Sequence, residues 1–158
     1  MDVHKCEINC CVVPALWSLH PRTSSEAAVV VAVLCRLLDA GLAPECVAVI
    51  TPYSAQVKLL QQLLSQDARG QVEVKSVDGF QGREKEVVVF SAVRASTRGG
   101  VGFLADTRRL NVALTRAKRG LVVVGSASTL QRDRVWRAWL QWAEFATVDE
   151  ALLLDSNA

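Results

Sequence analysis

The sequence has neither strong charge nor long apolar runs. Its net charge is only +2 over 158 residues, which is too small to argue for nucleic-acid binding, so any basic surface must come from local placement of arginines. No apolar run approaches the roughly 18 to 20 residues of a membrane span. The N-terminus lacks the charged and apolar layout of a signal peptide. We therefore expect an intracellular protein, in the nucleus or cytoplasm, without membrane contact.

The sequence also lacks a disulfide framework. It has five cysteines, and an odd number suits reduced thiols. His4, Cys6, Cys10 and Cys11 crowd together near the N-terminus, which raises a zinc site as an alternative. Their spacing matches no standard arrangement of two ligand pairs, and no second pair follows. We expect ordinary thiols and no metal site.

What is present is the composition of one globular domain. Hydrophobic residues make up 51% of the chain and charged residues 22%, which excludes a disordered class. Short apolar runs typical of strands covered on both faces alternate with stretches of helical periodicity. The strands are expected at 47–50, 71–76, 87–93 and 121–125, and the helices at 23–38, 54–65, 106–118 and 128–144. This alternation predicts an α/β fold, a parallel sheet with helices on both faces.

The domain is expected to span residues 23–146. Residues 1–22 carry little pattern and are either an edge strand, an N-terminal extension or the remnant of an upstream domain, and residues 147–158 form a tail. Thr23-Ser24-Ser25-Glu26 has the pattern of a capping box at the start of the first helix.

Polar segments follow three of the predicted strands. They are Thr51-Pro52-Tyr53 after Ile50, residues 77–84 after Ser76, and Arg94 after Val93. In open α/β sheets, ligands bind beyond the carboxyl ends of the strands. We therefore predict one site at one edge of the sheet.

The segment 76–84 combines two glycines, two acids and an amide. Gly79 and Gly82 permit backbone conformations or close approaches that bulkier residues forbid. The segment fits a phosphate-approaching loop and a tight turn equally well. It is not a Walker A loop, because no Gly-Lys-Ser/Thr follows, and no Walker A loop occurs anywhere in the chain.

The predicted helix 106–118 carries a cluster of basic side chains. Asp106 lies where a carboxylate helps a helix to begin. Arg109 and Arg116 are seven residues apart, which puts them on nearly one face, where a guanidinium could bind phosphate. A solvated basic face is the favoured alternative on these residues alone, since the cluster comprises Arg108, Arg109, Arg116, Lys118 and Arg119.

Trp136, Trp139 and Trp142 recur at every third residue. Stacking on exposed bases is the functional interpretation. A helix that packs large aromatic rings into the core is the favoured one.

Four segments together resemble one known family. Residues 50–56, 76–86, 102–106 and 108–118 are similar to motifs IV, V and VI of superfamily 1 helicases of the nonsense-mediated-decay type, in the same order and with similar gaps. The resemblance covers residues 25–126 and implies the second, C-terminal RecA-like domain of such a helicase. The large zinc-finger helicases that act as transcriptional coactivators are one compatible source.

The resemblance implies a nucleotide site. Tyr53 resembles the tyrosine that stacks on the base of ATP, and Gln56 lies one helical turn further on. Gly82 and Glu84 resemble the residues near the γ-phosphate and the sugar. Arg116 resembles the arginine finger, which stabilises charge on the transferring phosphoryl group. ATP and Mg²⁺ would be shared with a first RecA-like domain that carries the Walker loops, so the isolated chain is expected to be inactive.

The resemblance also implies a nucleic-acid site. Ser76 and Arg94 match positions that contact a single strand of RNA or DNA. The sequence departs from some relatives at Val57, where they have an arginine, and Lys58 would point about 100° away on a helix. Two alternatives remain: a non-catalytic, shortened helicase-fold module that acts in protein binding or transcriptional coactivation, and a nucleotide-binding α/β protein unrelated to helicases.

Overall fold

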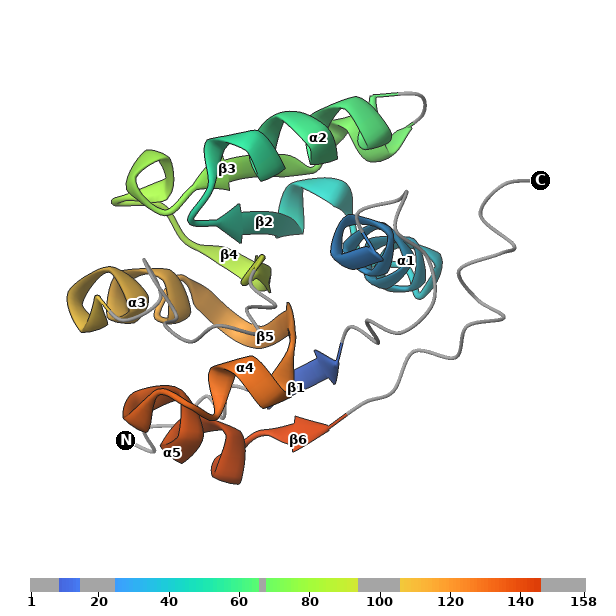
Figure 1. Ribbon diagram of the computed structural model, residues 1–158. Helices are drawn as coiled ribbons and strands as arrows, with labels where there is room; N and C mark the ends of the chain where they lie inside the picture. The colour runs from blue at the N-terminus through green and yellow to red at the C-terminus, as the bar shows by residue number, and fades with distance from the viewer. Residues whose placement is uncertain (1–8, 15–24, 66–67, 94–105, 146–158) are drawn as a thin grey trace, which may run out of the picture.

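The computed structural model describes residues 9–14, 25–65, 68–93 and 106–145 of the chain. These residues form a six-stranded sheet with the strand order β3-β2-β4-β5-β1-β6, and its ladders are parallel. The strands are β1 (Asn9–Pro14), β2 (Val47–Thr51), β3 (Glu73–Ser76), β4 (Lys85–Ser91), β5 (Ala117–Gly125) and β6 (Glu144–Phe145). Figure 1 shows the sheet extending from β3, beneath α2, to β6.

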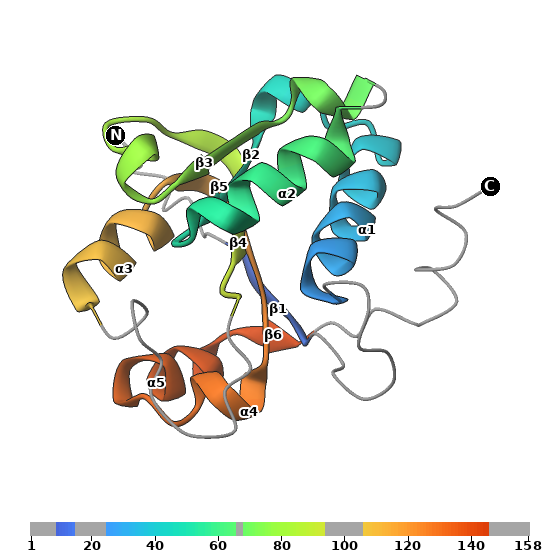
Figure 2. The ribbon, with the colours of Figure 1, turned by 45° about the horizontal axis from the view of Figure 1, so that its top comes forward.

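Helices connect the strands as parallel pairing requires. They are α1 (Ser25–Asp39), α2 (Ser54–Leu64), α3 (Thr107–Leu114), α4 (Ala127–Leu130) and α5 (Arg134–Trp142), with short 3₁₀ turns η1 (Pro44–Cys46), η2 (Ala68–Gln71) and η3 (Asp78–Phe80). Helices α1 and α2 lie on one side of the sheet and α3 on the other (Figure 2). The predicted α/β fold with helices on both faces is confirmed.

The sheet is apolar on both faces because alternate residues of its central strands enter different cores. In β2, Ala48 and Ile50 belong to the core beneath α3, α4 and α5, whereas Val47 and Val49 belong to the core beneath α1 and α2. All four side chains are fully buried. This is the burial expected of a parallel strand covered on both sides.

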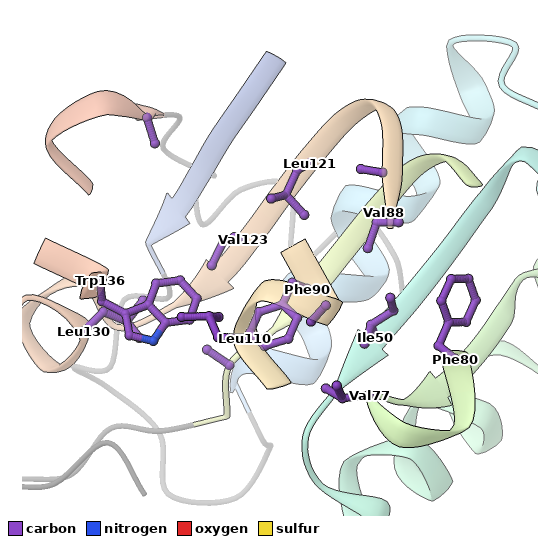
Figure 3. Packing of buried hydrophobic residues seen from close by; sticks show 14 of the residues in the cluster. Ile50, Val77, Phe80, Val88, Phe90, Leu110, Leu121, Val123, Leu130 and Trp136 are labelled. Atoms are coloured by element: carbon purple, nitrogen blue, oxygen red, sulfur yellow. The ribbon is translucent and has the colours of Figure 1, made fainter. Parts of the chain in front are cut away.

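Trp136 lies at one end of the core beneath α3, α4 and α5. Its side chain is fully buried, and its ring centroid lies 6.0 Å from that of Phe90 and 5.7 Å from that of Trp139. Figure 3 shows Trp136 beside Leu130, and Phe90 between it and Ile50. The core interpretation is confirmed for Trp136, whereas Trp142 is 67% exposed.

Three sequence-based expectations were wrong in detail. The helix expected over 106–118 ends at Leu114, because the chain enters β5 at Ala117. The last helix is divided, since Asp133 caps a new helix through the backbone N–H groups of Val135 and Trp136. Strand β1 is not an edge strand: it pairs with β5 and β6, so residues 9–14 belong to the sheet and not to a separate extension.

Among the described residues, no helix is long and apolar enough to cross a membrane.

Candidate functional site

The loops of the site lie at two edges of the sheet. Thr51 and Ser76 are register partners at the carboxyl ends of β2 and β3, and Tyr53 follows directly. Lys85 and Ala117 are partners at the amino ends of β4 and β5, so the residues just before them, Glu84 and Arg116, lie at the opposite edge. We call Tyr53, Gln56 and Ser76 the carboxyl-edge group, and Gly82, Glu84 and Arg116 the amino-edge group.

The segment between β3 and β4 connects these two edges. It leaves the carboxyl edge at Val77, whose N–H donates to the carbonyl oxygen of Thr51 at 3.2 Å. Phe80 is fully buried in the core beneath α3 and anchors the segment midway. The N–H of Arg83 donates to the carbonyl oxygen of Phe80 at 3.2 Å, and the chain then enters β4 at Lys85.

Arg116 is held at the amino edge by backbone oxygens. Its Nε donates to the carbonyl of Val112 at 2.9 Å, and Nη1 lies 3.5 Å from the carbonyl oxygen of Arg83. Its Nη2 donates to Oγ1 of Thr115 at 3.2 Å. The last carbonyls of a helix carry partial negative charge, so the end of α3 favours the guanidinium at this point.

The backbone of Arg116 also joins the two motifs. Its carbonyl oxygen accepts from the N–H of Lys85 at 3.1 Å. Arg116 therefore lies directly beside the segment that carries Gly82 and Glu84, and Glu84 is exposed there. The amino-edge group is brought together as the sequence predicted.

The two glycines of the segment have different reasons to be glycine. Gly82 has φ +77°, and a Cβ there would meet nothing within 4 Å, so the backbone conformation requires glycine. At Gly79, a Cβ would lie 3.1 Å from Oγ of Ser76, so a side chain there would have to displace this hydroxyl. Both reasons were anticipated for this segment.

The side chains of the carboxyl-edge group make contacts within the domain. Gln56 is only 6% exposed, and its Nε2 donates to Oγ of Ser91 at 3.2 Å. Oγ of Ser76 accepts from the N–H of Gly79 at 3.1 Å. Tyr53 is half-buried at the start of α2. The nucleotide-binding role of Gln56 stays a prediction, and its observed contact is internal.

The expectation of one site at one edge is confirmed for the starts of the loops after β2 and β3, and it is wrong for residues 82–84 and Arg116, which lie at the other edge. Ile50 pairs with Phe90, which aligns Thr51 with Ser91, seven residues along β4 from Glu84. At about 3.3 Å per residue, the two edges are roughly 20 Å apart. The prediction failed because residues 77–84 begin at the carboxyl end of β3 and end at the amino end of β4.

A second correction concerns the arginines. Arg109 lies near the start of α3, where its Nε is 3.7 Å from carboxylate oxygens of Asp78 and of Asp106. Arg116 lies in the turn after the last residue of α3. Arg116 is therefore outside the helix, and the helical spacing that put it on one face with Arg109 does not apply.

Other predictions lie outside the described residues. These concern Arg94, the segment 102–105, and the zinc alternative at His4 and Cys6. In the part of the chain that the structure describes, no group of three or more His, Cys, Asp or Glu side chains could hold a metal ion.

Sequence reasoning missed the surroundings of Glu26. Its Oε1 accepts from Oγ of Ser91 at 2.6 Å and from the N–H of Val93 at 2.7 Å, so the carboxyl group faces the end of β4. Burial raises the pKa of Glu26 more than these hydrogen bonds lower it. The one available signal was an acid followed by an apolar helical stretch, and the capping box accounted for it.

Comparison with known proteins identifies the family of the chain. Residues 20–128 match the family model described as AAA domain. The chain is 43% identical over 124 residues to the regulator of nonsense transcripts 1 homolog of Drosophila melanogaster, a match that covers 75% of this chain and 10% of that protein. It is 45% identical over 135 residues to the DNA polymerase alpha-associated DNA helicase A of Schizosaccharomyces pombe, covering 84% and 20%. The chain thus spans a tenth to a fifth of these relatives.

Solved structures agree on the fold. The C-terminal domain of a possible DNA helicase from Lactobacillus plantarum WCFS1 matches with a TM-score of 0.53 at 17% identity, over 92% of this chain and 82% of that chain. The DEAD-box protein SrmB of Escherichia coli matches with a TM-score of 0.50 at 13% identity, over 92% and 94%. The fold is therefore that of the RecA-like domains of helicases. The placement among zinc-finger coactivator helicases stays a prediction. The chain belongs to the AAA domain family, within the superfamily 1 helicases of the nonsense-mediated-decay type.

Proposed function

We propose that the chain is the C-terminal motor domain of an ATP-dependent helicase, and that its two sheet edges have different tasks. The amino-edge group completes an ATP site shared with a first RecA-like domain. The carboxyl edge contacts a single strand of RNA or DNA. The observation that carries the proposal is the position of Arg116, whose guanidinium lies beside the carbonyl oxygen of Arg83 in the segment that holds Gly82 and Glu84.

The contacts of Arg116 suit an arginine finger. Among the described residues, the hydrogen-bond partners of its guanidinium are neutral: the carbonyls of Val112 and Arg83 and the hydroxyl of Thr115. Its positive charge is therefore not cancelled by a carboxylate partner in these contacts. A planar guanidinium matches phosphoryl oxygens in geometry, and held in place it stabilises charge that develops on them.

The amino-edge group fits part of an ATP site. Arg116 supplies a cation, Gly82 leaves the backbone open on one side, and the exposed carboxylate of Glu84 can accept from a sugar hydroxyl. Bound ATP with Mg²⁺ supplies the phosphoryl group whose transfer drives the motor. The chain has no Walker lysine, so the remaining phosphate and metal contacts are assigned to the partner domain.

The carboxyl edge supports the nucleic-acid contact. Ser76 lies there, and Arg94 follows β4 in the sequence. Tyr53 is better assigned to this edge than to the ATP base because it lies two residues beyond Thr51, the register partner of Ser76. An aromatic ring at the edge provides a face for base stacking.

The test uses a fusion of this chain to a first RecA-like domain with intact Walker loops. Arg116→Ala is expected to lower the ATPase rate by about 10³-fold, the lower end of measured arginine-finger effects. Arg119→Ala is the matched control, since Arg119 is 76% exposed and pairs with Glu86 at 2.9 Å. Steady ATPase activity of the chain without a partner domain, abolished by Arg116→Ala, would refute the shared site.

A further inference from the structure

A buried polar network joins three elements at the carboxyl end of β4. Ser91 is fully buried, Glu26 of α1 is 4% exposed, and Gln56 of α2 is 6% exposed. Oε1 of Glu26 accepts from both Ser91 Oγ, at 2.6 Å, and the N–H of Val93, at 2.7 Å. Gln56 donates to Ser91 Oγ at 3.2 Å. Residues that are 35 to 67 positions apart in the sequence thus share one set of hydrogen bonds.

The hydrogen bonds satisfy only one of the two buried carboxyl oxygens of Glu26. Oε2 of Glu26 is buried and has no partner among the described residues. A buried carboxyl oxygen without a partner is rare in native proteins. The position of Glu26 therefore calls for a role beyond packing.

The backbone conformation of Val93 indicates what that role is. Its φ is +54°, in the left-handed region, which is a genuine outlier for a β-branched residue. Such a conformation persists only where the surroundings impose it. The N–H of Val93 is held at 2.7 Å by Glu26, so the carboxyl group is the contact placed to impose it.

We propose that Glu26 is a positioning residue, which holds Val93 in the left-handed conformation and thereby sets the direction in which the chain leaves β4. Ser91 and Gln56 connect Glu26 to α2 through further hydrogen bonds. The end of β4 and the start of α2 are thereby held in a fixed position relative to each other. The residue after Val93 is Arg94. The consequence for nucleic acid rests on the proposed function, and the restraint on Val93 does not.

The restraint is tested by NMR on the chain itself. The one-bond Cα–Hα coupling of Val93, which reports the sign of φ, is compared in the wild type, Glu26→Leu and Glu26→Gln. Leucine fills the space without an acceptor, whereas glutamine keeps one acceptor oxygen. Val93 is expected to leave positive φ in Glu26→Leu and to keep it in Glu26→Gln and in the control Glu45→Gln, an exposed site. A positive φ that survives in Glu26→Leu overturns the proposal.

The consequence is tested on the fusion of this chain to a first RecA-like domain, by fluorescence anisotropy with labelled single-stranded DNA and RNA oligonucleotides. Glu26→Leu is expected to weaken binding about tenfold, the factor by which left-handed φ is disfavoured for a side chain with a Cβ. Adding Val93→Gly should recover most of the loss, because glycine adopts positive φ freely. Loss of binding without recovery would show a packing role only, and would overturn the positioning role. A wild-type fusion that binds neither oligonucleotide would refute the proposed carboxyl-edge function, and the NMR result would still decide the role of Glu26.

Discussion

Replacing Trp136 by alanine is expected to remove the largest single contribution to the core beneath α4 and α5. The indole is fully buried, with the ring of Phe90 tilted against it and that of Trp139 edge-on to it. A buried tryptophan covers about 150–250 Å², which at about 25 cal/mol per Å² corresponds to about 4–6 kcal/mol. Measured tryptophan-to-alanine costs in cores are about 3–5 kcal/mol. We expect a loss of about 4 kcal/mol, a large share of the roughly 5–15 kcal/mol of a typical domain.

The assay is urea unfolding followed by far-ultraviolet circular dichroism, which does not depend on the number of indoles. Trp142→Ala, on the same helix, is the control. Trp142 is 67% exposed, so its replacement should change the free energy of unfolding by less than about 0.5 kcal/mol. Equal losses in the two variants would refute the packing of α5 described above.

Three further predictions concern single contacts. Gly125→Ala should cost about 1–3 kcal/mol, because the new Cβ would lie 2.9 Å from that of Ala92; Ala92→Gly in the same chain should recover most of the loss in melting temperature. Asp106→Ala should cost about 1 kcal/mol, since the carboxylate caps α3, and first-turn amides of α3 should exchange faster, with Asp106→Asn close to wild type. Burial raises the pKa of Glu26 above its usual 4.5, so the folded chain binds this proton more tightly than the unfolded chain does. The unfolding free energy of the wild type relative to Glu26→Gln should therefore fall as the pH rises from about 4.5 through the folded pKa, and a rise would contradict the direction of the shift.

The sequence predicted the strands and helices where local pattern and packing agree. Val47 to Ile50 is apolar throughout, and it is buried on both faces of the sheet. Helix α2 begins at Ser54, as expected, and ends within one residue of the expected position. Boundaries failed where a long-range pairing decides them. Residues up to Lys118 continue the helical pattern, but from Ala117 on the chain pairs with β4 as strand β5.

The sequence placed all the proposed site residues in one site, and the structure divides them between two edges of the sheet. Gly82, Glu84 and Arg116 lie together because β4 and β5 are neighbours, and the order of strands is not written in local periodicity. The same topology separates Tyr53 from them. Glu26 was unpredictable from its neighbours in sequence, because its partner Ser91 is 65 residues away.

The two-edge arrangement is tested most directly by measuring ATP turnover and oligonucleotide affinity on the same fused protein. Arg116→Ala is predicted to lower kcat for ATP hydrolysis with little change in the Kd for a single-stranded oligonucleotide. Tyr53→Ala is predicted to remove about 1–3 kcal/mol of stacking free energy, which raises that Kd by a factor of roughly 5 to 150. The KM for ATP should change little. A Tyr53→Ala variant that raises the KM for ATP and leaves the oligonucleotide Kd unchanged would return Tyr53 to the nucleotide and contradict the division of tasks between the two edges.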